Sequence, residues 1–140
     1  MPPNMKMATS QTDAIYIQQI NINSINNKKN EVGVYLDEVK CHILCINDTR
    51  LTKSKNLRFK GYKTFRKDHH SGKSLPGGVA ILCQNELKAY EVHCSNNEMC
   101  IVQFIHAHKL FRVAILYLHP GQHLTQSHIS STTTQVEGIN

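Results

Sequence analysis

A short apolar run that ends at an acidic residue and then turns basic constrains the fold of this chain most. Residues 43–46, Ile-Leu-Cys-Ile, have the length and composition of a buried strand, and a polar Asn-Asp-Thr turn follows them directly. Residues 15–23 read as a second strand that also ends in polar side chains. A carboxylate at the end of a buried strand, here Asp48, has the placement of a metal ligand.

The segment between these two strands, residues 24–40, has the spacing of a helix. Val32, Leu36 and Val39 recur at helical intervals, and Ser24 is the expected N-terminal cap. A right-handed strand-helix-strand crossover places its strands side by side and parallel, which brings Asn21 and Asp48 to the same edge. On spacing alone, however, the simpler interpretation is favoured, with Asp48 a turn residue and Asn21 a strand-end cap.

The rest of the chain reads as a series of strands with short turns. A Gly77-Gly78 pair opens one of them, where a side chain would obstruct close backbone packing. The last predicted strand is apolar on both faces, so we expect it to be a central strand. The expected strands are residues 62–67, 79–83, 87–94, 99–106 and 110–118.

Positive charge is concentrated in residues 50–73. This segment holds nine of the sixteen lysines and arginines and a single acid, Asp68, within a chain of net charge +6. A basic run interleaved with aromatic residues predicts contact with a phosphate backbone, although a solvated basic loop is the common alternative. The candidate nucleic-acid-binding residues are Arg50, Lys53, Lys55, Arg58, Lys60, Lys63, Arg66, Lys67 and Lys73.

Five blocks of sequence, in order, resemble the endonuclease/exonuclease/phosphatase family. They are residues 17–29 (IQQININSINNKK), 45–51 (CINDTRL), 61–68 (GYKTFRKD), 77–82 (GGVAIL) and 113–121 (VAILYLHPG). The likeness is greatest to the apurinic-endonuclease-like domain of jockey-type non-LTR retrotransposons. It covers residues 14–121 and corresponds to somewhat more than the first half of the family domain.

The resemblance implies a fold, an activity and a site. The fold would be part of a four-layer α/β sandwich of the DNase I-like kind, here truncated and mostly β with one main N-terminal helix. The activity would be Mg²⁺- or Mn²⁺-dependent nicking of DNA for target-primed reverse transcription. Asn21 and Tyr117 match catalytic positions, Asp68 matches an Asp of less defined role, and Asp48 stands where the family has its metal-binding Glu.

Several features of the family site are changed or lacking. Asp48 shortens the metal-binding arm by one methylene, which weakens Mg²⁺ binding, and Asn47 is a second change in the same turn. No later Asp-x-Asn or Ser-Asp-His block occurs, and loss of a general base alone lowers a rate by about 10²- to 10⁴-fold. We expect that His119, His123 and His128 cannot substitute, because no acid is placed to orient them.

Composition sets the remaining expectations. The 140 residues suffice for one domain, and the longest apolar run, residues 113–118, excludes a transmembrane helix and a membrane partner. Five cysteines without a Cys-x-x-Cys pair predict free thiols, and residues 1–13 lack a signal peptide, so we expect an intracellular, nuclear protein rather than a secreted one. Residues 1–13 and 122–140 are expected to be poorly ordered tails.

Three functional hypotheses follow from this reading. The first is an impaired endonuclease from a truncated mobile element, acting through Asn21, Asp48 and Tyr117. The second is a non-catalytic remnant that binds DNA or another nucleic acid through residues 50–73. The third, less favoured, is another phosphoesterase branch of the family, such as a phosphoinositide phosphatase or a deadenylase. A truncated sandwich would also expose strand edges, which predicts self-association.

Overall fold

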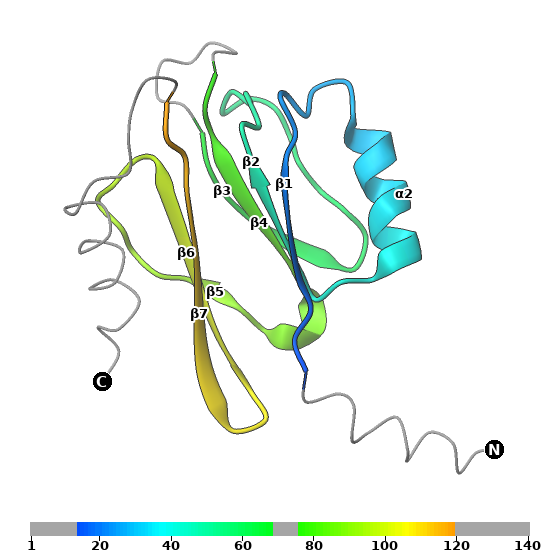
Figure 1. Cartoon of the computed structure of the whole chain (residues 1–140), viewed down its shortest axis with the longest axis vertical. Coiled ribbons are helices and arrows are strands. Elements are labelled where there is room, and N and C mark those ends of the chain that lie inside the picture. The colour runs from blue at the N-terminus through cyan, green and yellow to red at the C-terminus, as the bar shows by residue number, and fades with distance from the viewer. Residues whose placement is uncertain (1–13, 69–75, 120–140) are drawn as a thin grey trace.

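Two β-sheets and one α-helix make up the part of the chain that the computed structural model describes, residues 14–68 and 76–119 (Figure 1). The four-stranded sheet contains, in spatial order, β1 (Ile17–Asn21), β2 (Ile43–Asn47), β4 (Val79–Gln84) and β3 (Tyr62–Lys67). The three-stranded sheet contains β5 (Tyr90–Glu91), β6 (Met99–His106) and β7 (Lys109–Leu116). The helix is α2 (Lys29–Val39), and a short 3₁₀ turn, η1 (Asn85–Leu87), follows β4.

The crossover predicted from the sequence is confirmed. β1 and β2 are parallel neighbours, and their register pairs Asn21 with Asn47. The last residues of both strands therefore lie at one edge of the sheet. β3 runs in the same direction as β2, because each of them is antiparallel to β4.

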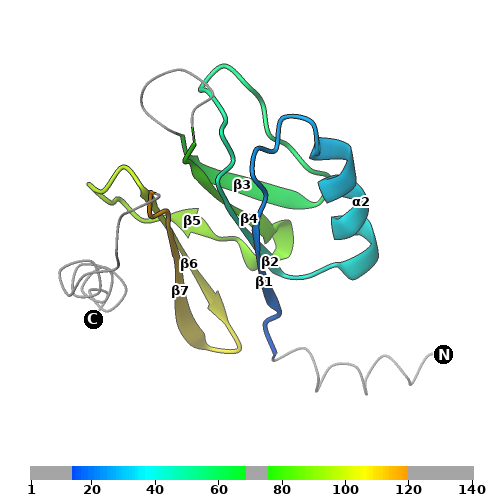
Figure 2. The same ribbon diagram turned by 45° about the horizontal axis from the view of Figure 1, so that its top comes forward.

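The apolar strands β2 and β4 are covered on both faces, which explains why their sequences do not alternate. One face packs against the three-stranded sheet through residues such as Ile43, Val79 and Phe104. The other face packs against α2, where Val32 and Leu36 are buried. The result is a layered α/β arrangement of helix, sheet and sheet, in agreement with the predicted sandwich (Figure 2).

The predicted cap of α2 is wrong. The helix begins after Lys28, which makes no side-chain capping bond, so it starts later than a cap at Ser24 would place it. Ser24 instead adopts a left-handed backbone with φ of 78°, and its N–H donates to the carbonyl of Asp48 at 2.9 Å. Ser24 is therefore used to join the two strand ends rather than to start the helix.

The second sheet differs from the prediction in two places. The predicted strand over residues 87–94 is reduced to Tyr90–Glu91, because η1 and its left-handed cap Lys88 take up the residues before it. β7 lies at the edge among the described strands, and β6 is central, so the prediction of a central last strand is wrong. The β6 side chains are buried along most of the strand, whereas β7 keeps partly exposed residues.

Within residues 14–68 and 76–119, no helix is long and apolar enough to cross a membrane. The two predicted tails, Lys73, His123 and His128 lie outside the described residues.

Candidate functional site

The polar residues singled out in the sequence gather at the edge of the sandwich where strands end. Asn21 ends β1, Asp48 follows β2, and Tyr117 follows β7. The side chain of Asn47 joins the two sheets at this edge, since its amide donates to the carbonyl of Leu116 at 3.2 Å. We call this region the site edge.

The turn that carries Asp48 is held by the glycine pair at the start of β4. Asp48 has a left-handed φ of 62°, which Asp tolerates better than most residues. Its N–H and that of Thr49 both donate to the carbonyl of Gly78, at 2.8 and 3.1 Å. Gly78 itself has φ of 89°, and a Cβ placed there would lie 2.5 Å from the hydroxyl oxygen of Thr49. The predicted need for glycine at this position is therefore confirmed.

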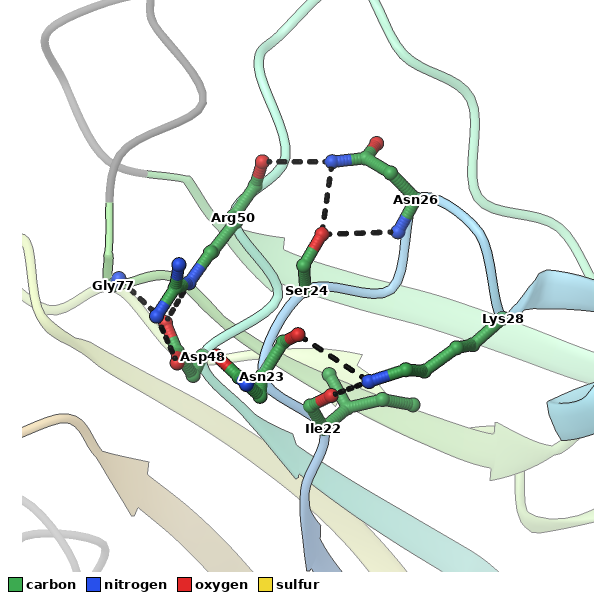
Figure 3. Close-up of polar contacts among 8 residues, drawn as sticks. All are labelled: Ile22, Asn23, Ser24, Asn26, Lys28, Asp48, Arg50 and Gly77. Carbon is green, nitrogen blue, oxygen red and sulfur yellow. Dashed lines mark hydrogen bonds and ion pairs between the residues drawn. The ribbon is translucent and has the colours of Figure 1, made fainter.

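Both oxygens of the Asp48 carboxylate are occupied by donors from the protein. Arg50 donates from Nε to Oδ1 and from Nη2 to Oδ2, each at 3.1 Å (Figure 3). The N–H of Gly77 also donates to Oδ1, at 2.8 Å. The Asp48 side chain is only 9% exposed, and its hydrogen bonds raise the pKa of Arg50. This carboxylate is thus an acceptor in a closed internal ion pair.

Tyr117 lies close enough to Asp48 and Arg50 for their charges to change the pKa of its phenol. Burial raises the pKa of the Tyr117 phenol above its ordinary value of 10.0, and the negative charge of Asp48 raises it further, while Arg50 opposes that rise. The hydroxyl is therefore protonated at neutral pH and is able to donate a hydrogen bond to an anion.

An acid does lie beside one histidine, contrary to the expectation from the sequence. Glu98 Oε2 lies 2.6 Å from Nε2 of His119, and the His119 ring packs edge-on against Tyr117 with centroids 4.8 Å apart. The backbone also fixes this corner, because the Tyr117 N–H donates to the carbonyl of Glu98 at 3.0 Å. The antiparallel pairing of β6 and β7 brings the two residues together, and their positions in the sequence gave no sign of it.

The residues at the site edge do not fit the Mg²⁺ that the resemblance implies. Mg²⁺ takes oxygen ligands at octahedral positions and usually one or two carboxylates. Both Asp48 oxygens already accept hydrogen bonds, and Glu98 is paired with His119. Across residues 14–68 and 76–119, no group of three or more His, Cys, Asp and Glu side chains is arranged to hold a metal ion. Asn21 lies at the same edge, on an exposed position.

The basic segment, which is continuous in sequence, divides into two places in the structure. Lys53 and Lys67 line a hollow beside the site edge together with Asn97 and the Arg66–Asp68 pair, and Lys55 is in the same loop as Lys53. Lys53, Lys55 and Lys67 are named the site-edge lysines. Arg58, Lys60 and Lys63 lie toward the opposite end of the sheet and are named the far-end cations.

Besides Arg50, two more of the predicted nucleic-acid-binding residues have structural partners. Arg66 pairs with Asp68 at 2.8 Å and also donates to the carbonyls of Thr52 and Lys55, which fixes the loop that carries the site-edge lysines. Lys67 donates to the carbonyl of Cys94 at 3.0 Å. Arg66 therefore positions the basic loop, and Asp68 neutralises the charge of Arg66.

Comparison with solved structures identifies the fold. The endonuclease domain of TRAS1, a telomere-specific non-LTR retrotransposon, matches with a TM-score of 0.65 and 14% identity, over 90% of this chain and 55% of that chain. The AP endonuclease LMAP of Leishmania major matches with a TM-score of 0.62 and 12% identity, over 88% and 44% of the two chains. An AP endonuclease of Archaeoglobus fulgidus matches with a TM-score of 0.53 and 20% identity, over 86% and 48%.

This chain has an endonuclease/exonuclease/phosphatase-like fold. The chain spans about half of the length of the solved structures that it matches. No family model and no curated protein sequence matches it. The resemblance read from five sequence blocks is thus confirmed at the level of the fold.

Within this endonuclease-like fold, two of the contacts that define the site edge were not predicted from the sequence. The Asp48–Arg50 pair was hidden because Arg50 was assigned to the basic segment. The Glu98–His119 pair could not be predicted because Glu98 precedes β6 and His119 follows β7, so the two residues are far apart in the sequence. Only the short Asn-Asp-Thr-Arg turn carried a signal for the first pair, and no local signal exists for the second.

Proposed function

We propose that this chain is the N-terminal part of an endonuclease-like domain of the non-LTR retrotransposon kind, and that in its present form it binds nucleic acid without cutting it. The ancestral role would be nicking of nuclear DNA for target-primed reverse transcription. The fold supports the nuclease ancestry, and the charges at the site edge support the present role.

The balance of charge at the site edge is the observation that carries this proposal. The two aspartates are each paired with an arginine, Asp48 with Arg50 and Asp68 with Arg66, and Glu98 Oε2 lies 2.6 Å from Nε2 of His119. Among the described residues, none of the three ion pairs involves a site-edge lysine. The lysines therefore give this edge an excess of positive charge, which attracts a polyanion.

The far-end cations are a weaker candidate surface. Lys60 shares one hollow with Asp37 and Glu86, so carboxylates reduce its attraction for phosphate. Lys63 lies over the ring of Phe65, with Nζ 5.1 Å from the centroid. We therefore assign nucleic-acid contact to the site-edge lysines rather than to the whole of residues 50–73.

Salt-dependent DNA binding tests this assignment. The variant K53Q/K55Q removes two exposed lysines from the site edge, and R58Q/K60Q removes the same charge from the other end. We expect K53Q/K55Q to lower affinity more and to reduce the slope of log K against log salt by about 1.4 to 1.8, since each phosphate contact contributes about 0.7 to 0.9. Equal losses in the two variants would mean that only net charge matters, which would contradict the proposed interface.

Nicking of supercoiled plasmid tests the absence of cleavage. The folded protein is incubated with Mg²⁺ or Mn²⁺ beside a D48A variant purified in the same way. We expect the same low background from both proteins. Nicking by the wild-type chain that disappears in D48A would show that Asp48 still serves a working site, and would favour the endonuclease hypothesis with Asn21 and Tyr117.

A further inference from the structure

The pair formed by Asp48 and Arg50 is built into the backbone of the turn. Arg50 also has a left-handed φ, of 56°, and its N–H donates to the carbonyl of Gly77 at 2.9 Å. Thr49, between them, accepts from the N–H of Ile25 at 3.0 Å. Both ends of the ion pair are thus anchored to β4 and to the residues after β1.

The geometry of the pair is the bidentate hydrogen bonding that a guanidinium makes with a carboxylate. Nε and Nη2 reach one carboxylate oxygen each, which is the two-pronged arrangement that lysine cannot make. The Asp48 side chain is 9% exposed and that of Arg50 is 31% exposed, so the contact lies partly out of water. The N–H of Gly77 satisfies Oδ1 a second time.

We propose that Arg50 is the resident cation of Asp48 and closes this carboxylate to divalent metal ions. A metal ion would have to displace the guanidinium from both oxygens, and it would then lie beside a positive charge that the anchored turn keeps in place. This inference concerns metal selectivity, and it holds whether or not the chain binds nucleic acid.

Binding of Mn²⁺ alone, measured through the electron paramagnetic resonance signal of the free ion, tests the inference without any nucleic acid. We expect the wild-type protein and D48N to bind Mn²⁺ equally, because Asp48 contributes nothing while Arg50 is present. Weaker binding by D48N than by the wild type would overturn the proposal. This comparison does not depend on the folding of any Arg50 variant.

A second set of variants shows whether Arg50 is the cause. R50Q keeps a polar side chain of similar length without the charge, and we expect it to gain a Mn²⁺ site about tenfold or more tighter than any in the wild type, since the positive charge that repels a metal ion from Asp48 is gone. The double variant D48N/R50Q should lose that site, and R50K, which keeps the charge, should bind no better than the wild type. No gain in R50Q, a gain that persists in D48N/R50Q, or a gain in R50K would each overturn the proposal.

Discussion

Replacement of Gly78 by alanine tests how the turn at the site edge is built. The new Cβ would lie 2.5 Å from the hydroxyl oxygen of Thr49, and Thr49 is fully buried, so it has no room to move away. The residue would also have to keep φ near 89°, a left-handed conformation that is unfavourable for alanine.

The cost of the close contact and the cost of the left-handed backbone can be measured separately, because Gly61 has a left-handed backbone without a close contact. Its φ is 84°, and a Cβ placed there would meet no atom within 4 Å. A left-handed alanine costs about 1 to 2 kcal/mol. Loss of chain entropy in the unfolded state returns about 0.4 to 1 kcal/mol of this. Gly61→Ala should therefore destabilise by about 0 to 1.6 kcal/mol, whereas Gly78→Ala should add about 1 to 3 kcal/mol of overpacking.

Urea unfolding followed by circular dichroism measures both free energies. We expect Gly78→Ala to be destabilised by about 1 to 4.6 kcal/mol and Gly61→Ala by about 0 to 1.6 kcal/mol, with Gly78→Ala the more costly by about 1 to 3 kcal/mol. In the background of Thr49→Ala, which removes the obstructing hydroxyl, Gly78→Ala should cost no more than Gly61→Ala does. If Gly78→Ala proves no more destabilising than Gly61→Ala, the close approach of Gly78 to Thr49 does not restrict the turn and our reasoning is refuted.

Three other predictions concern regions away from this turn. The Nδ1 of His42 accepts a hydrogen bond from the N–H of Tyr16 at 2.9 Å, and burial together with His106 lowers the pKa of His42 below 6.5. The contribution of neutral His42 to stability should therefore be present above pH 6.5 and lost as the pH falls through the folded-state pKa. A plot of unfolding free energy against pH that is no flatter for His42→Gln than for the wild type would contradict this. Ile105 is 69% exposed on the β6–β7 hairpin, and the outer edge of β7 is unpaired among the described strands, so we expect the chain to self-associate. Ile105→Lys should shift the sedimentation coefficient toward that of a monomer. A wild-type chain that sediments as a monomer at high concentration would refute this. Burial raises the pKa of Cys45 to about 11, and of Cys83 and Cys100 to about 12. These thiols should therefore not react with a maleimide at pH 8 until the protein unfolds. Mass spectrometry that finds them labelled in the native protein would contradict this.

Much of the fold follows from local patterns in the sequence. The strands at residues 62–67, 79–83 and 99–106 were predicted almost residue for residue, because short apolar or alternating runs bounded by glycine and polar turns have few other solutions. The parallel pairing of β1 and β2 followed from chain connectivity. The failure at Ser24 reflects its backbone contact to the distant Asp48, whereas the strand predicted over residues 87–94 is shortened by the local 3₁₀ turn η1 and its left-handed cap Lys88.

What the sequence by itself determined is the order of the elements, the family likeness of the fold, and the set of polar residues that reach the site edge. These depend on hydrophobic periodicity and connectivity, which are properties of the chain. Only the tertiary structure decided how those polar residues are paired. The left-handed turn at Asp48 and Arg50 depends on the glycine pair that precedes β4, and the Glu98–His119 pair depends on the register of β6 with β7. A side chain's partner is set by the direction in which the folded backbone points it, so the step from a metal ligand to an internal ion pair could not be read from residue types alone.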